Sequence, residues 1–330
     1  MMEKDNLISR KSFLNFVAIG TGSLVAGDVL FDYEAAWCKE VETPKRLELD
    51  QAIPTRMDTV RGLAFDSEDR LHIAGSGGVV IADTDGSVIR EFSPKGLISG
   101  ITVDEDGSMF LCHATRVQHL DPEGKQVTLW GEAGKERGQF GYLTGIALSG
   151  AMLYLADAGN RRITRYAING DYVDEIDGFS IPSAYFDCGI DGKGDLYVGH
   201  TSKHQVEKYD GNHELVEVWG EYGSDPEKFC GCCNPTHIAV YPDGNVATTE
   251  KGIPRLKVYG PYGNLLAYLS PEQLGLSPDP HFLKQLQENS DGSLPCHDGW
   301  PGMPLAVSKN LRLAVAIPGT GEIKIYRMDG

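Results

Sequence analysis

The sequence is poor in basic residues, and no segment of it is a concentrated basic patch. Its 330 residues include 30 Lys and Arg against 47 Asp and Glu, which gives a formal net charge of -17. Such a balance repels polyphosphates and anionic lipids. We therefore expect no nucleic-acid partner. We expect membrane contact only if the N-terminal segment described below is retained.

Several motifs of common enzyme classes are also missing. The chain has no G-x-S-x-G elbow and no H-E-x-x-H pair, which mark many hydrolases and zinc proteases. The stretch Gly75-Ser76-Gly77-Gly78 does not lie between a strand and a helix, so it does not predict a nucleotide-binding loop. The hydrophobic fraction of 41% and the charged fraction of 23% exclude disordered, collagen-like and coiled-coil chains.

The N-terminal segment has the order of regions found in export signals. Ser9-Arg10-Lys11-Ser12-Phe13-Leu14 precedes an apolar stretch from Phe16 to Val29. This segment resembles the twin-arginine signal, with Lys11 in place of the second arginine. We assign residues 1–40 to an export signal and linker, and we expect an exported protein of the periplasm or cell envelope. An ordinary apolar helix and a retained anchor are the alternatives.

Glycine is what the chain has in excess, with 40 residues, and much of it belongs to an internal repeat. Each unit contains short strands of alternating apolar and polar residues that are separated by turns of the Asp-Gly type. Repeats of several tens of residues with this content are typical of β-propeller blades. The six copies begin at Gly62, Gly100, Gly145, Asp187, His237 and Pro304.

The unit from Gly145 to Gly170 is the clearest copy, and its most specific part is Asn160-Arg161-Arg162-Ile163. This unit resembles the NHL repeat. The resemblance covers residues 60 to 330 and implies an all-β, six-bladed NHL-type β-propeller, which we assign to residues 41–330. Weaker copies depart from the pattern, since Pro254-Arg255-Leu256 replaces the Asn-Arg step in the fifth unit.

The last unit offers only three strands before the chain stops at Gly330. The segment from Arg46 to Ile53 alternates apolar and polar residues ahead of the first unit. We therefore predict that this N-terminal strand closes the last blade, which removes an exposed sheet edge. Ser277 to Asn289 predicts one short helix that covers a mouth of the channel.

The repeat places polar residues at one rim of the predicted channel. Ends of second strands and starts of first strands share that rim, and so do the long connections between blades. The candidate ligand or metal residues there are His113, Asp157, Asp187, His200, His237 and Glu250. Imidazole and carboxylate groups together can bind a divalent transition metal or supply a general base. The alternative is that these side chains cap strand ends by hydrogen bonding.

Cysteines mark two rim connections. Cys230, Cys232 and Cys233 precede the fifth unit, and Cys296 and His297 lie in the next long connection. Disulfides among Cys230, Cys232, Cys233 and Cys296 are the usual outcome outside the cytosol. A metal or cluster site that includes His297 and free thiols are the alternatives. No second C-x-x-C is present to complete a zinc ribbon. Cys112 and Cys188 occupy core-strand positions and are expected to be buried.

The segment Cys232-Cys233-Asn234-Pro235-Thr236-His237 resembles the corresponding segment of peptidyl-hydroxyglycine α-amidating lyase, a propeller enzyme with a histidine-bound zinc. That family's metal histidines occur one position earlier in the repeat than His237. We do not carry the lyase activity over, because none of the matching positions is histidine. These positions hold Arg61, Ser99, Thr144, Phe186, Thr236 and Met303.

The sequence thus predicts an exported propeller that binds a protein partner, a small ligand or a metal at a His- and Cys-rich rim. Whether the chain is an enzyme stays open. One alternative is a metal-dependent hydrolase or lyase that uses the same rim, with Arg255 holding an anionic substrate. A second alternative is a redox-associated module with a Cys-bound metal or cluster. Fold alone does not choose among these functions.

Overall fold

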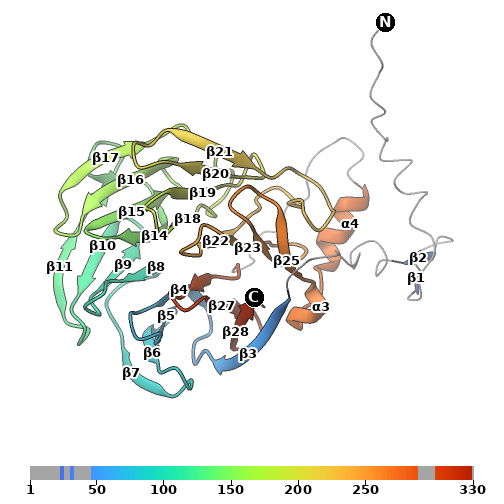
Figure 1. Cartoon of the computed structure of the whole chain (residues 1–330), viewed down its shortest axis with the longest axis horizontal. Coiled ribbons are helices and arrows are strands. Elements are labelled where there is room, and N and C mark those ends of the chain that lie inside the picture. The colour runs from blue at the N-terminus through green and yellow to red at the C-terminus, as the bar shows by residue number, and fades with distance from the viewer. Residues whose placement is uncertain (1–22, 26–29, 33–45, 289–301, 329–330) are drawn as a thin grey trace, which may run out of the picture.

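The computed structural model describes residues 23–25, 30–32, 46–288 and 302–328. It contains six antiparallel four-stranded sheets that are arranged radially (Figure 1). The first strands of neighbouring sheets contact one another in a closed ring, since β26 also contacts β4. The all-β, six-bladed propeller that the repeats predict is therefore confirmed.

Strands follow chain order within each of the first five blades. Blade 1 contains β4 (Val60–Phe65), β5 (Leu71–Gly75), β6 (Gly78–Ala82) and β7 (Val88–Phe92). Blade 2 contains β8 (Ile98–Val103), β9 (Met109–His113), β10 (Arg116–Leu120) and β11 (Gln126–Trp130). Blade 3 contains β14 (Leu143–Ser149), β15 (Met152–Asp157), β16 (Arg162–Ala167) and β17 (Tyr172–Ile176).

The remaining blades repeat this arrangement. Blade 4 contains β18 (Cys188–Ile190), β19 (Leu196–His200), β20 (Gln205–Tyr209) and β21 (Leu215–Trp219). Blade 5 contains β22 (His237–Val240), β23 (Val246–Thr249), β24 (Leu256–Tyr259) and β25 (Leu265–Leu269). Blade 6 contains β26 (Leu305–Val307), β27 (Arg312–Ile317), β28 (Glu322–Met328) and β3 (Leu47–Pro54).

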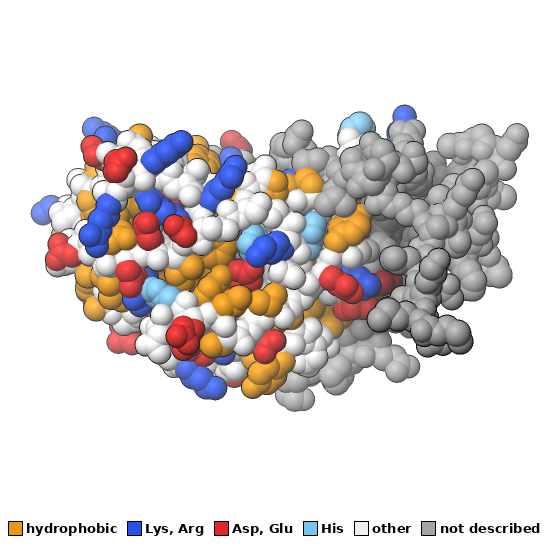
Figure 2. Space-filling model, turned by 90° about the horizontal axis from the view of Figure 1, so that it is seen from above, with side chains coloured by type: hydrophobic (Ala, Val, Ile, Leu, Met, Phe, Trp, Pro, Cys, Tyr) orange, Lys and Arg blue, Asp and Glu red, His pale blue; other side chains and the backbone are white. Residues whose placement is uncertain are grey.

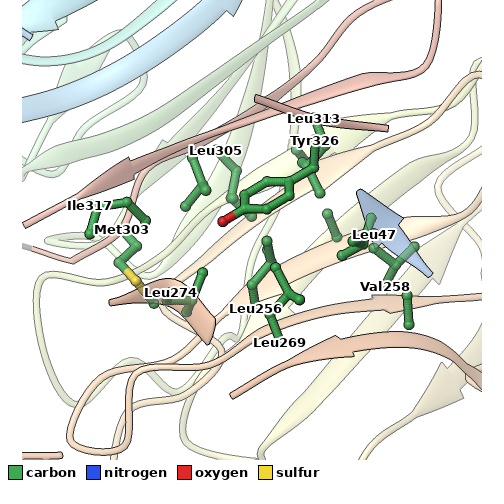
Figure 3. Close-up of a cluster of buried hydrophobic side chains, with 14 of the residues drawn as sticks. Leu47, Leu256, Val258, Leu269, Leu274, Met303, Leu305, Leu313, Ile317 and Tyr326 are labelled. Atoms are coloured by element: carbon green, nitrogen blue, oxygen red, sulfur yellow. The ribbon is translucent and has the colours of Figure 1, made fainter. Parts of the chain in front are cut away.

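Blade 6 is closed by β3, which precedes blade 1 in the chain and pairs with β28. β3 pairs antiparallel with β28 over its whole length, from Leu47 opposite Met328 to Pro54 opposite Glu322. Leu47 enters a buried cluster with side chains of blades 5 and 6, and the ring of Tyr326 lies in the middle of that cluster (Figure 3). The predicted closure by the N-terminal strand is confirmed.

Glycine allows the tight turn before the fourth strand of most blades. In blade 3 the amide of Gly170 donates to the Ala167 carbonyl at 2.8 Å, and Gly170 has φ +91°. The pairing of β16 with β17 has a bulge at Arg165/Tyr166, beside this turn, as expected for a turn that ends in a left-handed residue. Blade 4 differs, because His213 with φ +65° takes this left-handed place.

The small elements lie outside the six sheets. β1 (Ser23–Val25) pairs antiparallel with β2 (Leu30–Asp32), and β12 (Glu132–Ala133) pairs parallel with β13 (Gln139–Phe140). α3 (Pro271–Leu274) follows blade 5, and α4 (Pro280–Glu288) falls inside the segment predicted to be helical. Phe282 of α4 packs against Cys230 and Ile253 on the rim of blade 5. None of the described helices is long and apolar enough to span a membrane.

Acidic and basic side chains are interspersed on the described part of the face in Figure 2, with hydrophobic side chains between them.

The fourth strands form the outer sheet edges and carry exposed apolar residues, among them Leu215 and Val216 of β21. The buried side chains instead form clusters between neighbouring blades. Each of these clusters therefore joins two neighbouring blades.

Candidate functional site

Asp157 is the last residue of the second strand of blade 3, and its side chain binds the backbone of the connection between blades 2 and 3. Its carboxylate accepts hydrogen bonds from the backbone amides of Gly141 and Tyr142 at 2.9 to 3.1 Å and from the side-chain amide of Asn160 at 2.8 Å. Arg162 then donates to two carbonyls of the same connection. All of this lies within blade 3 and its connection, as the capping interpretation expects.

His200 holds the matching place in blade 4 and is also buried. Its Nδ1 lies 2.8 Å from Glu207 Oε1, and its Nε2 accepts from the amide of Ser180 at 3.0 Å. Tyr209 donates to the other oxygen of Glu207 at 2.7 Å, and Lys203 lies 3.2 Å from Oε1. Burial raises the pKa of Glu207, but the bonds from His200 and Tyr209 outweigh it and lower the pKa to about 2.

This carboxylate predicts a stability change in acid. Glu207 has a folded pKa of about 2 against a usual 4.5, so its contribution is full above pH 4.5 and is lost as the pH falls through 2. We expect Glu207→Gln to remove up to about 3 kcal/mol of unfolding free energy at pH 7 and to flatten the decline between pH 4.5 and pH 2. Urea unfolding at a series of pH values measures this. The exposed Glu214→Gln is the control and is expected to keep the parent profile.

Glu250 follows the second strand of blade 5 and forms a fully buried ionic cluster. Arg255 Nη2 lies 2.5 Å from Glu250 Oε2, Lys257 pairs with Oε1, and the amide of Cys230 donates to Oε2 at 2.9 Å. Burial raises the pKa of Glu250, but Arg255 and Lys257 outweigh this effect, so that the pKa is lowered and the carboxylate stays ionised. Burial also lowers the pKa of Lys257, although Glu250 opposes that shift.

Arg255 also binds the backbone of the connection between blades 4 and 5. Its guanidinium donates to the carbonyls of Ser224, Asp225 and Lys228 at 2.9 to 3.3 Å. Arg162 does the same in blade 3, so Arg255 takes the role that the Asn-Arg step has in the clearest repeat. The side chain predicted to hold an anionic ligand is therefore surrounded by protein groups.

The predicted rim residues do not converge on one point. His113 of blade 2 faces the carbonyl of Leu97 at 3.1 Å and Gln118 Oε1 at 3.0 Å. His200, Asp157 and Glu250 each contact their own blade. Within the described ranges, no group of three or more His, Cys, Asp and Glu side chains is placed to hold a metal ion.

Asp187 and His237 are the two predicted residues that do meet across blades. They stand at the starts of the first strands of blades 4 and 5, and His237 Nδ1 lies 3.3 Å from Asp187 Oδ2. An ionised carboxylate only accepts hydrogen bonds, so Nδ1 is the donor in this contact, and the tautomer protonated at Nδ1 carries its lone pair on Nε2. His237 Nε2 is buried and has no hydrogen-bond partner among the described residues.

Two glycines make room for this pair, which we call the dyad. A Cβ on Gly145 would lie 2.4 Å from Asp187 Oδ1, and a Cβ on Gly302 would lie 2.6 Å from His237 Nε2. Tyr185 presents its ring edge-on to the imidazole, with the centroids 6.2 Å apart. Lys251 Nζ lies 4.7 Å from the centroid of the Tyr185 ring. The dyad therefore has an aromatic side and a cation nearby.

Two of the predicted cysteines also meet. Cys232 Sγ lies 3.0 Å from Cys233 Sγ, while the thiol of Cys230 is buried among apolar side chains. Burial raises the pKa of Cys230 to about 11, although Arg255 opposes this. Cys112 and Cys188 are buried as expected. The predictions for Cys296 and His297 fall outside the described residues.

Sequence comparison adds no relative to this picture. The chain matches no protein-family model, and no curated protein matches it.

Sequence reasoning missed several partners. Glu207 and Lys257 occupy the same position in the repeat, because Glu207 follows His200 by seven residues and Lys257 follows Glu250 by seven residues. In β24 the charged Lys257 between apolar residues was the available signal, whereas β20 also contains Gln205 and Lys208, so Glu207 did not stand out there. Tyr185 lies in the connection between β17 and β18, and Lys251 lies in the turn between β23 and β24, so strand alternation gave no signal for either residue.

Proposed function

We propose that this chain is an exported NHL-repeat propeller that binds a small molecule, or a side chain of a protein partner, at the dyad. The observation that carries this proposal is the buried Nε2 of His237, which has no hydrogen-bond partner among the described residues. A buried acceptor left unsatisfied costs about 1–3 kcal/mol. A ligand that donates a hydrogen bond to Nε2 recovers this free energy.

The surroundings define the chemistry of such a ligand. A hydroxyl, amide or ammonium group can donate to Nε2, because Asp187 holds the other nitrogen as a donor. Tyr185 offers a ring edge for an apolar or aromatic portion. A divalent transition metal is the second form of the proposal, since a carboxylate behind an imidazole is the usual support of a metal-bound histidine. In that case His237 Nε2 would be the one imidazole ligand that the dyad supplies to the ion.

The repeat supports the NHL identity through the Asp157, Asn160 and Arg162 contacts, which join the clearest repeat motif to its own connection. The charged and apolar order of the N-terminal segment supports export. Fractionation of bacteria that express the full chain tests the location, and recovery of all of the protein in the cytoplasm would argue against it.

The hydrolase or lyase alternative receives less support. It needs Glu250 as a ligand or base and Arg255 as an anion holder, but these two residues are buried and bonded to each other. His200 is likewise bonded at both nitrogens. We therefore favour binding at the dyad over metal-dependent catalysis at the rim.

Probe binding at His237 tests the proposal. We expect zinc chloride, or a member of a library of small alcohols, amides and amines, to shift the Nε2 resonance of His237 in ¹⁵N-histidine-labelled protein. At 100 times its Kd a probe should add about 2.7 kcal/mol to the unfolding free energy. His237→Gln should abolish this gain. Elemental analysis of protein purified without added metal separates the two forms, since a tightly held metal would copurify.

The matched control is His119, whose Nε2 is also buried without a described partner but whose ring stacks on Phe110 inside blade 2. His119→Gln should leave probe binding unchanged. Equal resonance shifts at His119 and His237, or no shift at His237 with any probe, would reject the dyad as the binding site.

A further inference from the structure

The cysteine connection carries a reactive pair that ligand binding at the dyad does not use. Cys232 and Cys233 are adjacent in sequence, and their sulfurs are only 3.0 Å apart. Cys232 is partly exposed, whereas Cys233 is buried. One thiol is thus accessible to an external reagent, and the second lies within reach of the first.

The backbone on both sides of the pair is firmly held. His204 Nε2 lies 2.5 Å from the carbonyl of Gly231, and the side-chain amide of Asn234 donates to the carbonyl of Lys251 at 3.1 Å. The amide of Cys230 is bonded to the buried carboxylate of Glu250. These contacts fix the positions of the two thiols before any reaction, which favours a second step within the protein.

We propose that Cys232 and Cys233 exchange with disulfides of other molecules, either an exposed protein disulfide or a low-molecular-weight disulfide. The Cys232 thiolate attacks one sulfur of the external disulfide, so that its S–S bond breaks and a thiolate leaves. The Cys233 thiolate then attacks Cys232 Sγ, and the second external thiolate leaves. The dithiol loses two electrons to the external disulfide, and its two protons pass to the two departing thiolates.

Geometry makes the product reversible rather than structural. Neighbouring Cα atoms are about 3.8 Å apart across a trans peptide, whereas ordinary disulfides need about 4.4 Å or more. A disulfide between adjacent residues is therefore strained and easily reduced, as labile and catalytic disulfides are. Cys230 is an unsuitable nucleophile, because burial raises its thiol pKa to about 11 and keeps it protonated.

The experiment uses the full chain, reduced and then freed of reductant, with the aromatic disulfide 5,5′-dithiobis(2-nitrobenzoate) as the external disulfide. We expect the parent protein to release two thionitrobenzoate ions from this pair and to keep none. Its mass should fall by two hydrogens, with the new bond inside one peptide that contains both cysteines. Cys233→Ser should release one ion and keep the other as a stable mixed disulfide on Cys232.

Further variants keep the test decisive. Cys232→Ser should react at least about tenfold more slowly, because its remaining thiol is buried. Cys230→Ser and Cys296→Ser should both react as the parent does, and circular dichroism checks that each variant is folded. Retention of the adduct on Cys232 or Cys233 of the parent protein would overturn the proposal. A product disulfide that links Cys232 or Cys233 to any other cysteine would also overturn it.

Discussion

Replacing Ile53 with aspartate will prevent the chain from accumulating as a folded monomer, whereas the same replacement of Leu49 will be tolerated. Both residues lie on β3, but the side chain of Ile53 is 2% exposed and that of Leu49 is 55% exposed. Ile53 packs between blades 6 and 1 with Ala316 and Ile323. Aspartate there places an unpaired charge in an apolar cluster and detaches the strand that closes the ring.

The size of this effect follows from what β3 contributes. Burial of Leu47 and Ile53 alone is worth about 1.5–3 kcal/mol each, and detachment also exposes the pairing edge of β28. These losses are comparable to a typical total stability of about 5–15 kcal/mol. Size-exclusion chromatography and urea unfolding of the two variants measure the difference. A monomeric Ile53→Asp protein with the parent midpoint would contradict closure by β3.

Replacing Glu250 with glutamine will lower the unfolding free energy by about 3–5 kcal/mol. Glutamine keeps the shape of the side chain but leaves Arg255 and Lys257 without a countercharge in the interior, where all three side chains are no more than 1% exposed. The penalty is large because an unpaired buried cation has neither water nor an anion to stabilise it. The matched control is Glu221→Gln, since Glu221 forms an exposed pair with Lys228. We expect the control to cost less than about 1 kcal/mol.

The Glu250→Gln variant also tests what holds the connection between blades 4 and 5. The guanidinium of Arg255 donates to three carbonyls of this connection, so its displacement should expose residues 220–231 to limited proteolysis. The triple variant Glu250→Leu, Arg255→Met and Lys257→Met should regain stability relative to Glu250→Gln, because no buried charge remains. Its connection should still be cleaved. A Glu250→Gln protein within about 1 kcal/mol of the parent would mean that the cluster is not a closed ionic network.

The blades could be predicted because their determinants are local. Alternating residues identify the strands, and turns such as the one that ends at Gly170 separate them. The missing fourth strand at Gly330 could be matched to the segment from Arg46 to Ile53 by counting alone. The rim could be predicted only as a set of positions, since counting shows which strand ends share a rim but not which side chains meet.

The sequence by itself therefore determined the six blades, their closure and the residues that stand at the rim. Only the tertiary structure decided that Glu250 pairs with Arg255 and Lys257, that His200 pairs with Glu207, and that His237 meets Asp187 fifty positions away. The physical reason is the range of each effect. Strand alternation and turn conformation depend on neighbours in sequence, whereas a charged or hydrogen-bonding side chain pairs with whatever group the folded connections bring within about 3 Å.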